Sequence, residues 1–176
     1  PMSARPPTTR CRPRHRAPAR ASCQTVDALP VRAASSRVIR GTVDQVWRAH
    51  HEPELLRRWQ LGPDGWTMPV CEVATSVGET YRYEWENEAD GRSFGFTGEL
   101  LEVLAPVRAV TTESMIGMDG PVVVNELTLT PLGSGTLLTM IGNYPDAETR
   151  EMILATGMAD GMETSYARLE REVLGV

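Results

Sequence analysis

Between Trp66 and Tyr144 the sequence is a succession of short strand-like segments separated by turn residues, and this pattern restricts the fold more than any other feature. In the segment 79–86, three aromatic residues (Tyr81, Tyr83, Trp85) alternate with charged residues, which is the period of a strand with one buried and one solvated face. Six strands at short spacing predict an antiparallel meander. We expect these strands at 66–75, 79–86, 93–104, 107–116, 122–130 and 136–143.

Helical patterns flank this region on both sides. A first short helix is expected after Thr42, because Thr42 and Gln45 have the spacing of a capping box. Pro53 suits the first turn of a second short helix, since the N–H group that proline lacks is not needed there. A short strand at 37–40 precedes both helices. The resulting order is a strand, two short helices, six strands and a final helix, which indicates an α+β fold.

The last segment has the pattern of one long amphipathic helix. Asp146 can cap it, and an apolar stripe continues without interruption to about Val173. At a rise of about 1.5 Å per residue such a helix would be about 40 Å long, enough to cross the sheet. Gly157 and Gly161 lie beside the stripe, one turn apart. We expect these glycines to allow a close approach of the helix backbone or to leave space beside it.

Residues 1–32 differ in composition from the rest of the chain. Six of the 18 basic residues, all of them Arg, precede residue 31, where Asp27 is the only acid. Repeated proline and the lack of an apolar period mean that this segment buries too little surface to offset its ordering entropy, so we expect it to be disordered. Three interpretations stay open: a disordered extension or over-long gene start, an organellar transit peptide, and an arm that contacts nucleic acid or a membrane surface.

The remainder, residues 33–176, is expected to form one domain. After residue 30, 12 arginines stand against 22 acids, a net charge of −10, which argues against nucleic-acid binding by the folded domain. No apolar run approaches the length of about 18 residues that a membrane span needs. Cys11, Cys23 and Cys71 are an odd number without paired spacing, which indicates neither a disulfide framework nor a metal site. We therefore expect a cytoplasmic protein.

Several segments, in a fixed order, carry a resemblance to a known family. They are Gly41–Ala49 with Pro53–Trp59, Gly62–Trp66, Val77–Tyr83, Phe96–Glu99, Gly135–Thr139, and Gly157–Met162 with Tyr166–Leu169. Together they resemble the family related to the C-terminal domain of the Hsp90 ATPase activator (AHSA1-like), within the START-like or SRPBCC superfamily. One departure is Glu52, which stands where the family often has an aspartate as the cap of the second helix.

The resemblance implies a bacterial protein with the helix-grip fold. In that fold a curved antiparallel sheet and two short helices close over a long C-terminal helix, and a cavity usually remains between sheet and helix. The resemblance covers about 140 residues, by the segments quoted, and leaves the N-terminal extension uncovered. It is a resemblance of fold, and fold alone does not establish an activity.

Aromatic and methionine side chains are candidates for the lining of this cavity, because methionine gives an apolar wall an adaptable surface. Each of them could equally be ordinary core. Asn125 shares a strand face with Leu127 and Leu129, so its amide needs partners, and a polar group of a ligand could be one. The candidate ligand-binding residues are Trp59, Trp66, Tyr83, Trp85, Phe96, Met115, Asn125, Met140, Met158 and Met162.

Other polar residues favour no chemistry on sequence grounds. His50 and His51 are adjacent on a helix end and should point apart, which favours a solvated helix junction over a metal site. Glu84 and Glu86 alternate with the aromatic residues of their strand and are expected to face water. The sequence has no recognisable nucleophile, phosphate-loop, dinucleotide or metalloprotease motif. We expect no metal and no cofactor.

The preferred function is the binding of a small hydrophobic or aromatic molecule, lipid-like or polyketide-like, by a carrier protein rather than by an enzyme. The first alternative is a cyclase or aldol-type enzyme, which would need an acid–base pair that faces the cavity. The second is a module that contacts a chaperone through an exposed apolar patch. Whether the protein is a monomer or a homodimer stays open.

Overall fold

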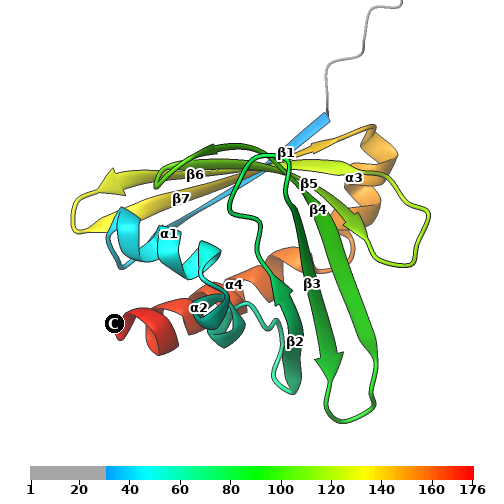
Figure 1. The fold of residues 1–176 in the computed structure, drawn as a ribbon, viewed down its shortest axis with the longest axis horizontal. Coiled ribbons are helices and arrows are strands. Elements are labelled where there is room, and N and C mark those ends of the chain that lie inside the picture. Colours follow the sequence, from blue (N-terminus) through cyan, green and yellow to red (C-terminus); the bar gives the residue numbers. More distant parts are fainter. Residues whose placement is uncertain (1–30) are drawn as a thin grey trace, which may run out of the picture.

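The structure is a computed structural model that describes residues 31–176 (Figure 1). The predicted disordered extension lies outside the described residues, except that Val31 and Arg32 begin strand β1 (Val31–Ile39). This strand is longer than the expected segment 37–40. It pairs along its whole length with β7 (Gly135–Tyr144), from Val31 opposite Tyr144 to Ile39 opposite Thr136, so the length of its partner sets its own.

All seven strands form one antiparallel sheet in the order β1-β7-β6-β5-β4-β3-β2. The predicted meander is therefore confirmed, and β1 closes it by pairing with the last strand. Figure 1 shows a strongly bent sheet, in which β2 to β4 descend steeply from the layer of β5, β6, β7 and β1. The remaining strands are β2 (Trp66–Glu72), β3 (Thr80–Asn87), β4 (Ser93–Leu104), β5 (Arg108–Met115) and β6 (Val123–Leu132).

Helices α1 (Val43–His51) and α2 (Pro53–Trp59) lie under the bend of the sheet (Figure 1). The predicted capping box of α1 is present, since Thr42 accepts from the Gln45 backbone while the Gln45 side chain accepts from the Thr42 backbone. Glu52 precedes α2 without a side-chain capping bond, as the weak capping ability of glutamate leads one to expect. The start of α2 is fixed instead by proline in its first turn.

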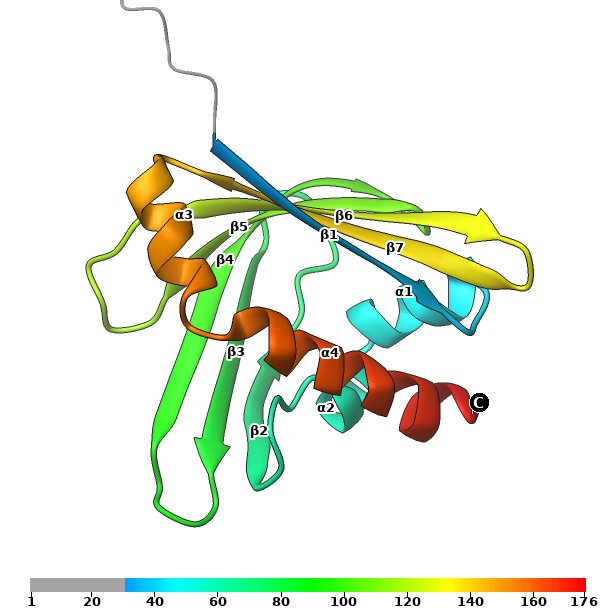
Figure 2. The ribbon, with the colours of Figure 1, turned by 180° about the vertical axis from the view of Figure 1, so that it is seen from behind.

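The C-terminal segment is two helices, so the prediction of one unbroken helix is wrong. Helix α3 (Ala147–Leu154) ends before Gly157, whose φ of +78° lies in the left-handed region that favours glycine. Helix α4 (Met158–Arg168) then starts in a new direction and continues into the π-helical turn η1 (Leu169–Leu174). Figure 2 shows why: α3 lies at the end of the sheet near β1 and β7, whereas α4 crosses beneath it.

The main core lies between the sheet, α1, α2 and α4. Two polar contacts attach the C-terminal end of the chain to the rest of the fold. The Glu170 carboxylate accepts the backbone N–H of Arg40 at 2.8 Å, and the Arg168 guanidinium donates to the backbone carbonyl of Gly62 at 3.0 Å. The largest fully buried apolar side chains are those of Ile39, Val46, Leu56, Trp59, Leu129, Leu138 and Leu169.

Strands β3, β4 and β5 approach one another so closely at Gly98 that no other residue fits. A Cβ atom there would lie 1.9 Å from the Thr112 carbonyl oxygen and 2.8 Å from the Tyr81 ring. Gly161 in α4 is the opposite case, because an added Cβ would meet no atom within 4 Å. Of the two alternatives expected for Gly157 and Gly161, close approach is absent and open space is present, since an added Cβ would meet no atom within 4 Å at either glycine.

We predict opposite effects for alanine at these two glycines. Gly98→Ala should lower the free energy of unfolding by about 3 kcal/mol or more, because backbone atoms must move to admit the methyl group. Gly161→Ala should raise it by about 1 kcal/mol, since alanine favours the helix and the site is open. Urea unfolding of both variants checks this pair. A tolerated Gly98→Ala would contradict the strand packing described here.

Candidate functional site

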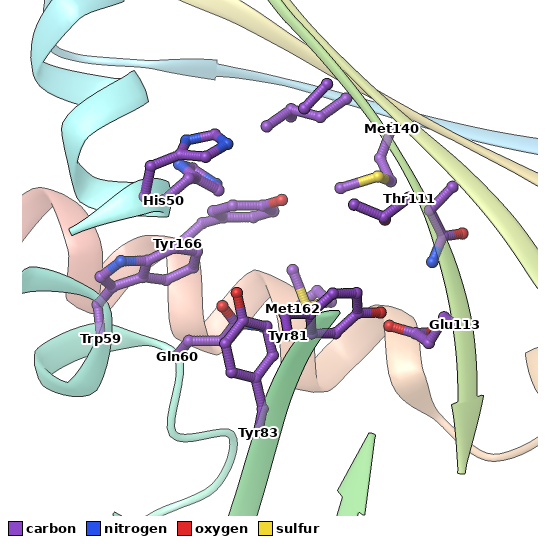
Figure 3. Close-up of a pocket in the computed structure, with 14 residues that line it drawn as sticks. His50, Trp59, Gln60, Tyr81, Tyr83, Thr111, Glu113, Met140, Met162 and Tyr166 are labelled. Carbon is purple, nitrogen blue, oxygen red and sulfur yellow. The ribbon is translucent and has the colours of Figure 1, made fainter. Parts of the chain in front are cut away.

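A cavity of about 140 Å³ lies between the bent sheet and the helices α1, α2 and α4 (Figure 3). Most of the 14 residues that line it have polar side chains, although it sits beside the main apolar core. The lining residues are His50, His51, Trp59, Gln60, Tyr81, Tyr83, Ala109, Thr111, Glu113, Asn125, Leu127, Met140, Met162 and Tyr166. Such a mixed lining can both enclose a small molecule and orient it.

His50, in the last turn of α1, presents a hydrogen-bond acceptor to the cavity. Its Nδ1 lies 2.7 Å from the backbone carbonyl oxygen of Val46, one helical turn earlier. A carbonyl oxygen only accepts, so Nδ1 carries the proton and Nε2 holds a lone pair. The side chain is half-buried, yet Nε2 itself is shielded from solvent and has no hydrogen-bond partner among the described residues.

Burial keeps both histidines uncharged. It lowers the pKa of His50 to about 4, with a smaller contribution from the neighbouring His51, against a rise caused by the bond to Val46. The pKa of His51 is also lowered by burial. His51 donates through Nδ1 to the Trp47 carbonyl at 2.9 Å and stacks on the Trp47 ring at 3.8 Å. The expected solvated junction is therefore wrong: both rings fold back over the helix and line the cavity.

Aromatic rings hold the His50 imidazole in place. The Trp59 ring meets it edge-on at 4.8 Å and stacks on Tyr166 of α4 at 5.5 Å. The Trp59 indole N–H donates to the Ala49 carbonyl at 2.9 Å, which fixes the orientation of the ring. In Figure 3 the Tyr166 hydroxyl points toward the middle of the cavity. This side of the cavity is thus a rigid aromatic wall.

The sheet supplies the opposite wall, where Glu113 of β5 faces the histidine side across the cavity (Figure 3). Burial raises the pKa of Glu113, and the polar side chains of Asn125 and Tyr81 beside it only partly oppose this rise. The carboxyl group therefore keeps its proton to a higher pH than an exposed glutamate does. The Tyr81 hydroxyl donates to the backbone carbonyl of Thr112 at 2.8 Å. Burial also raises the pKa of Tyr83, which stays a neutral hydroxyl.

Half of the residues predicted from the sequence line this cavity. Tyr83, Asn125, Met140, Met162 and Trp59 do so, from five different elements. Their convergence reflects the bend of the sheet, which brings β3, β6 and β7 over α2 and α4 (Figure 2).

The other half lies elsewhere. Met115 and Met158 are at the surface, with exposed fractions of 39% and 44%. The buried Trp85 donates its indole N–H to the Gln60 carbonyl at 2.6 Å and serves as core, with Phe96 packed against it. Trp66 packs edge-on against Phe94 at 5.2 Å, outside the cavity. Strand alternation, and for Met158 the apolar stripe of the last helix, placed these side chains on inner faces, but the cavity occupies only the part of the interior near the bend.

Sequence reasoning missed the chemically important members of the lining. His50 follows Val46 by four residues and so shares the inner face of α1, a signal that was present. Glu113 shares a strand face with Thr111 and Ala109, which marks an acid on an inward-facing strand position. Glu84 and Glu86 were expected to face water, and neither lines the cavity.

A second cavity, of about 180 Å³, lies on the other side of His51. It is lined by Trp47, His51, Ala74, Thr75, Leu100, Val103 and Ala105, and has no acid. Within residues 31–176, no group of three His, Cys, Asp or Glu side chains is placed to hold a metal ion. In the same range every helix is too short or too polar to cross a membrane.

The sequence profile of a family described as activator of Hsp90 ATPase homolog 1-like protein matches residues 40–173. The chain belongs to this family. The predicted AHSA1-like resemblance and helix-grip fold are thereby confirmed. Membership places the chain among proteins that bind ligands or resemble Hsp90 activators in general, and names no ligand.

Solved structures of bacterial proteins share this AHSA1-like fold. A Rhodobacter sphaeroides protein is 30% identical with a TM-score of 0.76, over 82% of this chain and 93% of its own. A Chromobacterium violaceum protein is 26% identical with a TM-score of 0.67, over 81% and 96%. An AHSA1-like protein from Aeromonas hydrophila shares the fold at 20% identity and a TM-score of 0.68, over 81% and 94%. No curated protein matches the chain.

The lowered pKa of His50 predicts a loss of stability in mild acid. Between about pH 6.5 and pH 4, His50 is protonated in the unfolded chain but not in the folded chain. Stability therefore rises with pH across this window. From about pH 7 to pH 5, His50 should account for a loss of about 2 kcal/mol. Urea unfolding at both values should show a drop that is smaller by this amount in His50→Phe. Equal pH dependence in both proteins would show that His50 titrates normally.

Proposed function

We propose that this protein binds a small, compact, uncharged molecule in the cavity beneath the bend of its sheet. The observation that carries this proposal is a partly open cavity of about 140 Å³ with polar groups on two facing walls. A cavity of about 150 Å³ in a protein interior is large enough for a benzene ring. The ligand is therefore of single-ring size.

This size narrows the expectation drawn from the sequence. Pockets for drug-sized molecules measure about 300–1,000 Å³, so a long acyl chain or a fused-ring polyketide needs several times the space present here. The lining also differs from that of a lipid carrier, because histidine, glutamate, tyrosine and asparagine side chains alternate with methionine and leucine around it. A compact ring with polar substituents fits both features better than a lipid does.

The charge of the lining supports an uncharged ligand. No Arg is among the lining residues, and Lys is absent from the chain, so a phosphate or carboxylate ligand would find no cation. Glu113 on the sheet side supplies no positive charge either, because a carboxyl group is neutral or negative. The lining disfavours a cation less than an anion, but its aromatic and thioether surfaces offer a ligand mainly apolar contact.

A cavity-filling substitution tests this proposal. Ala109→Leu places a larger side chain in the proposed site, and Ala74→Leu is its matched control, because Ala74 is equally buried (6% against 5% exposed) but lines the second cavity. In calorimetric titrations we expect benzene and phenol to bind the wild type, and decanoate not to bind. Ala109→Leu should abolish ring binding and Ala74→Leu should retain it. Binding of decanoate alone, or the reverse pattern of variants, would contradict the proposal.

An enzymatic function is the second candidate, and one observation favours it. His50 and Glu113 face the same cavity from opposite sides, and burial shifts their pKa values in opposite directions. Such a pair, a histidine whose pKa is lowered and a carboxyl group whose pKa is raised, is an arrangement used for general acid–base catalysis. Contact with a chaperone, the N-terminal extension, the cytoplasmic location and the oligomeric state stay predictions.

Cyclohexanone tests the enzymatic candidate, because it is a single ring with acidic hydrogens beside a carbonyl group. If the pair transfers protons, the protein should speed the exchange of these hydrogens for solvent deuterium by about a hundredfold or more, as followed by NMR. His50→Phe and Glu113→Gln should each remove the acceleration. Exchange at the rate seen without protein would leave binding as the function.

A further inference from the structure

We infer that the ligand of this cavity donates a hydrogen bond to Nε2 of His50, and is therefore a neutral single ring that bears a hydroxyl or N–H group. The inference rests on the proposed binding function and adds the chemistry of the ligand to it. Phenols and azoles are the simplest molecules of this class. Ethers, hydrocarbons and carboxylates of the same size fall outside it.

The first argument is that Nε2 of His50 is a buried acceptor without a donor. Among the described residues it is the one shielded side-chain nitrogen or oxygen atom that lacks a hydrogen-bond partner. Buried polar groups in folded proteins are nearly always paired, so an unpaired one that faces a cavity marks the position of a partner from outside the chain. Its lone pair is fixed by the Nδ1 bond to the Val46 carbonyl, so the partner has to donate.

The second argument is that neighbouring donors of the protein have other partners or directions. The Trp59 indole N–H, on the ring nearest to His50, donates to the Ala49 carbonyl. The Tyr81 hydroxyl donates to the Thr112 carbonyl. The Tyr166 ring lies 6.3 Å from the imidazole, centroid to centroid, and Figure 3 shows its hydroxyl directed into the cavity and away from His50.

The third argument is that the facing groups complement a hydroxyl ligand. An oxygen that gives its proton to His50 still has lone pairs, which can accept a hydrogen bond from another donor in the polar lining of the cavity. The remaining ring would rest among Met140, Met162 and Tyr83. The uncharged His50 imidazole has its one proton on Nδ1 and does not donate through Nε2, so the oxygen of an ether or a carboxylate placed there would find no donor.

Calorimetric titration of the full chain with phenol, anisole and toluene tests this inference. The three rings have similar size, but only phenol has a proton to donate. In a cavity without an acceptor, the phenol hydroxyl would lose its hydrogen bonds to water and gain none in return, so toluene would bind more tightly. With His50 as the acceptor, we expect phenol to bind about tenfold more tightly than anisole or toluene.

The variant His50→Phe should reverse this order while still binding toluene, because it keeps the ring and removes the acceptor. Tighter binding of toluene by the wild type would overturn the inference and leave the binding function standing. Failure of all three rings to bind would overturn both. A preference for phenol that survives His50→Phe and is lost in Glu113→Gln would also overturn it, since the carboxyl group would then be the acceptor.

A measurement on the wild type covers the case in which His50→Phe does not fold. The ¹⁵N resonance of His50 Nε2 should shift when phenol binds and stay unchanged when toluene binds. If the chemical shift of this resonance stays unchanged at a saturating concentration of phenol, the inference is overturned.

Discussion

The cavity depends on the contact between Arg168, at the end of α4, and the chain that follows α2. This nearly buried guanidinium donates to the carbonyl oxygens of Gly62 and Trp59, at 3.0 Å and 3.4 Å, and to the Asp64 carboxylate at 3.0 Å. Asp64 is fully exposed, so that ion pair contributes little, and the two carbonyl groups carry the contact. Without it, Trp59 and Tyr166 would lose the spacing that keeps them stacked as one wall, and α4 would be free to settle against the sheet.

The helix break and the bent sheet, together with this contact, leave a cavity between the sheet and α4. A straight helix from Asp146 onward would follow one line along the sheet, whereas the turn at Gly157 lets α3 stay at the sheet's end and α4 cross under the bend. The curved sheet then stands away from α4 at its centre. Polar residues on both sides of that gap are protected from bulk water, which is why the pKa values of His50 and Glu113 move in opposite directions.

The sequence was sufficient to predict the strands and the two short helices, but not the break at Gly157 or the chemistry of the site. Local rules hold wherever a residue's own neighbours decide its structure, as in the capping box of Thr42 and the alternation around Tyr83. Asn125 was found because a polar residue on an apolar strand face needs a partner. His50 was missed because its direction depends on a bond to Val46 and on a ring from another helix. The alternation rule also cannot locate the bend of a sheet, so it placed Met115 and Trp85 in a cavity that lies elsewhere.

The account therefore stands on the charge and tautomer of one buried imidazole. Long-range ¹H–¹⁵N correlation NMR of the ligand-free protein at about pH 6, below the usual histidine pKa of about 6.5, measures both directly. We predict a neutral His50 ring with its proton on Nδ1 and a bare Nε2. A ring protonated on both nitrogens, or with its proton on Nε2, would contradict the account, because the cavity would then present a donor where we have placed an acceptor.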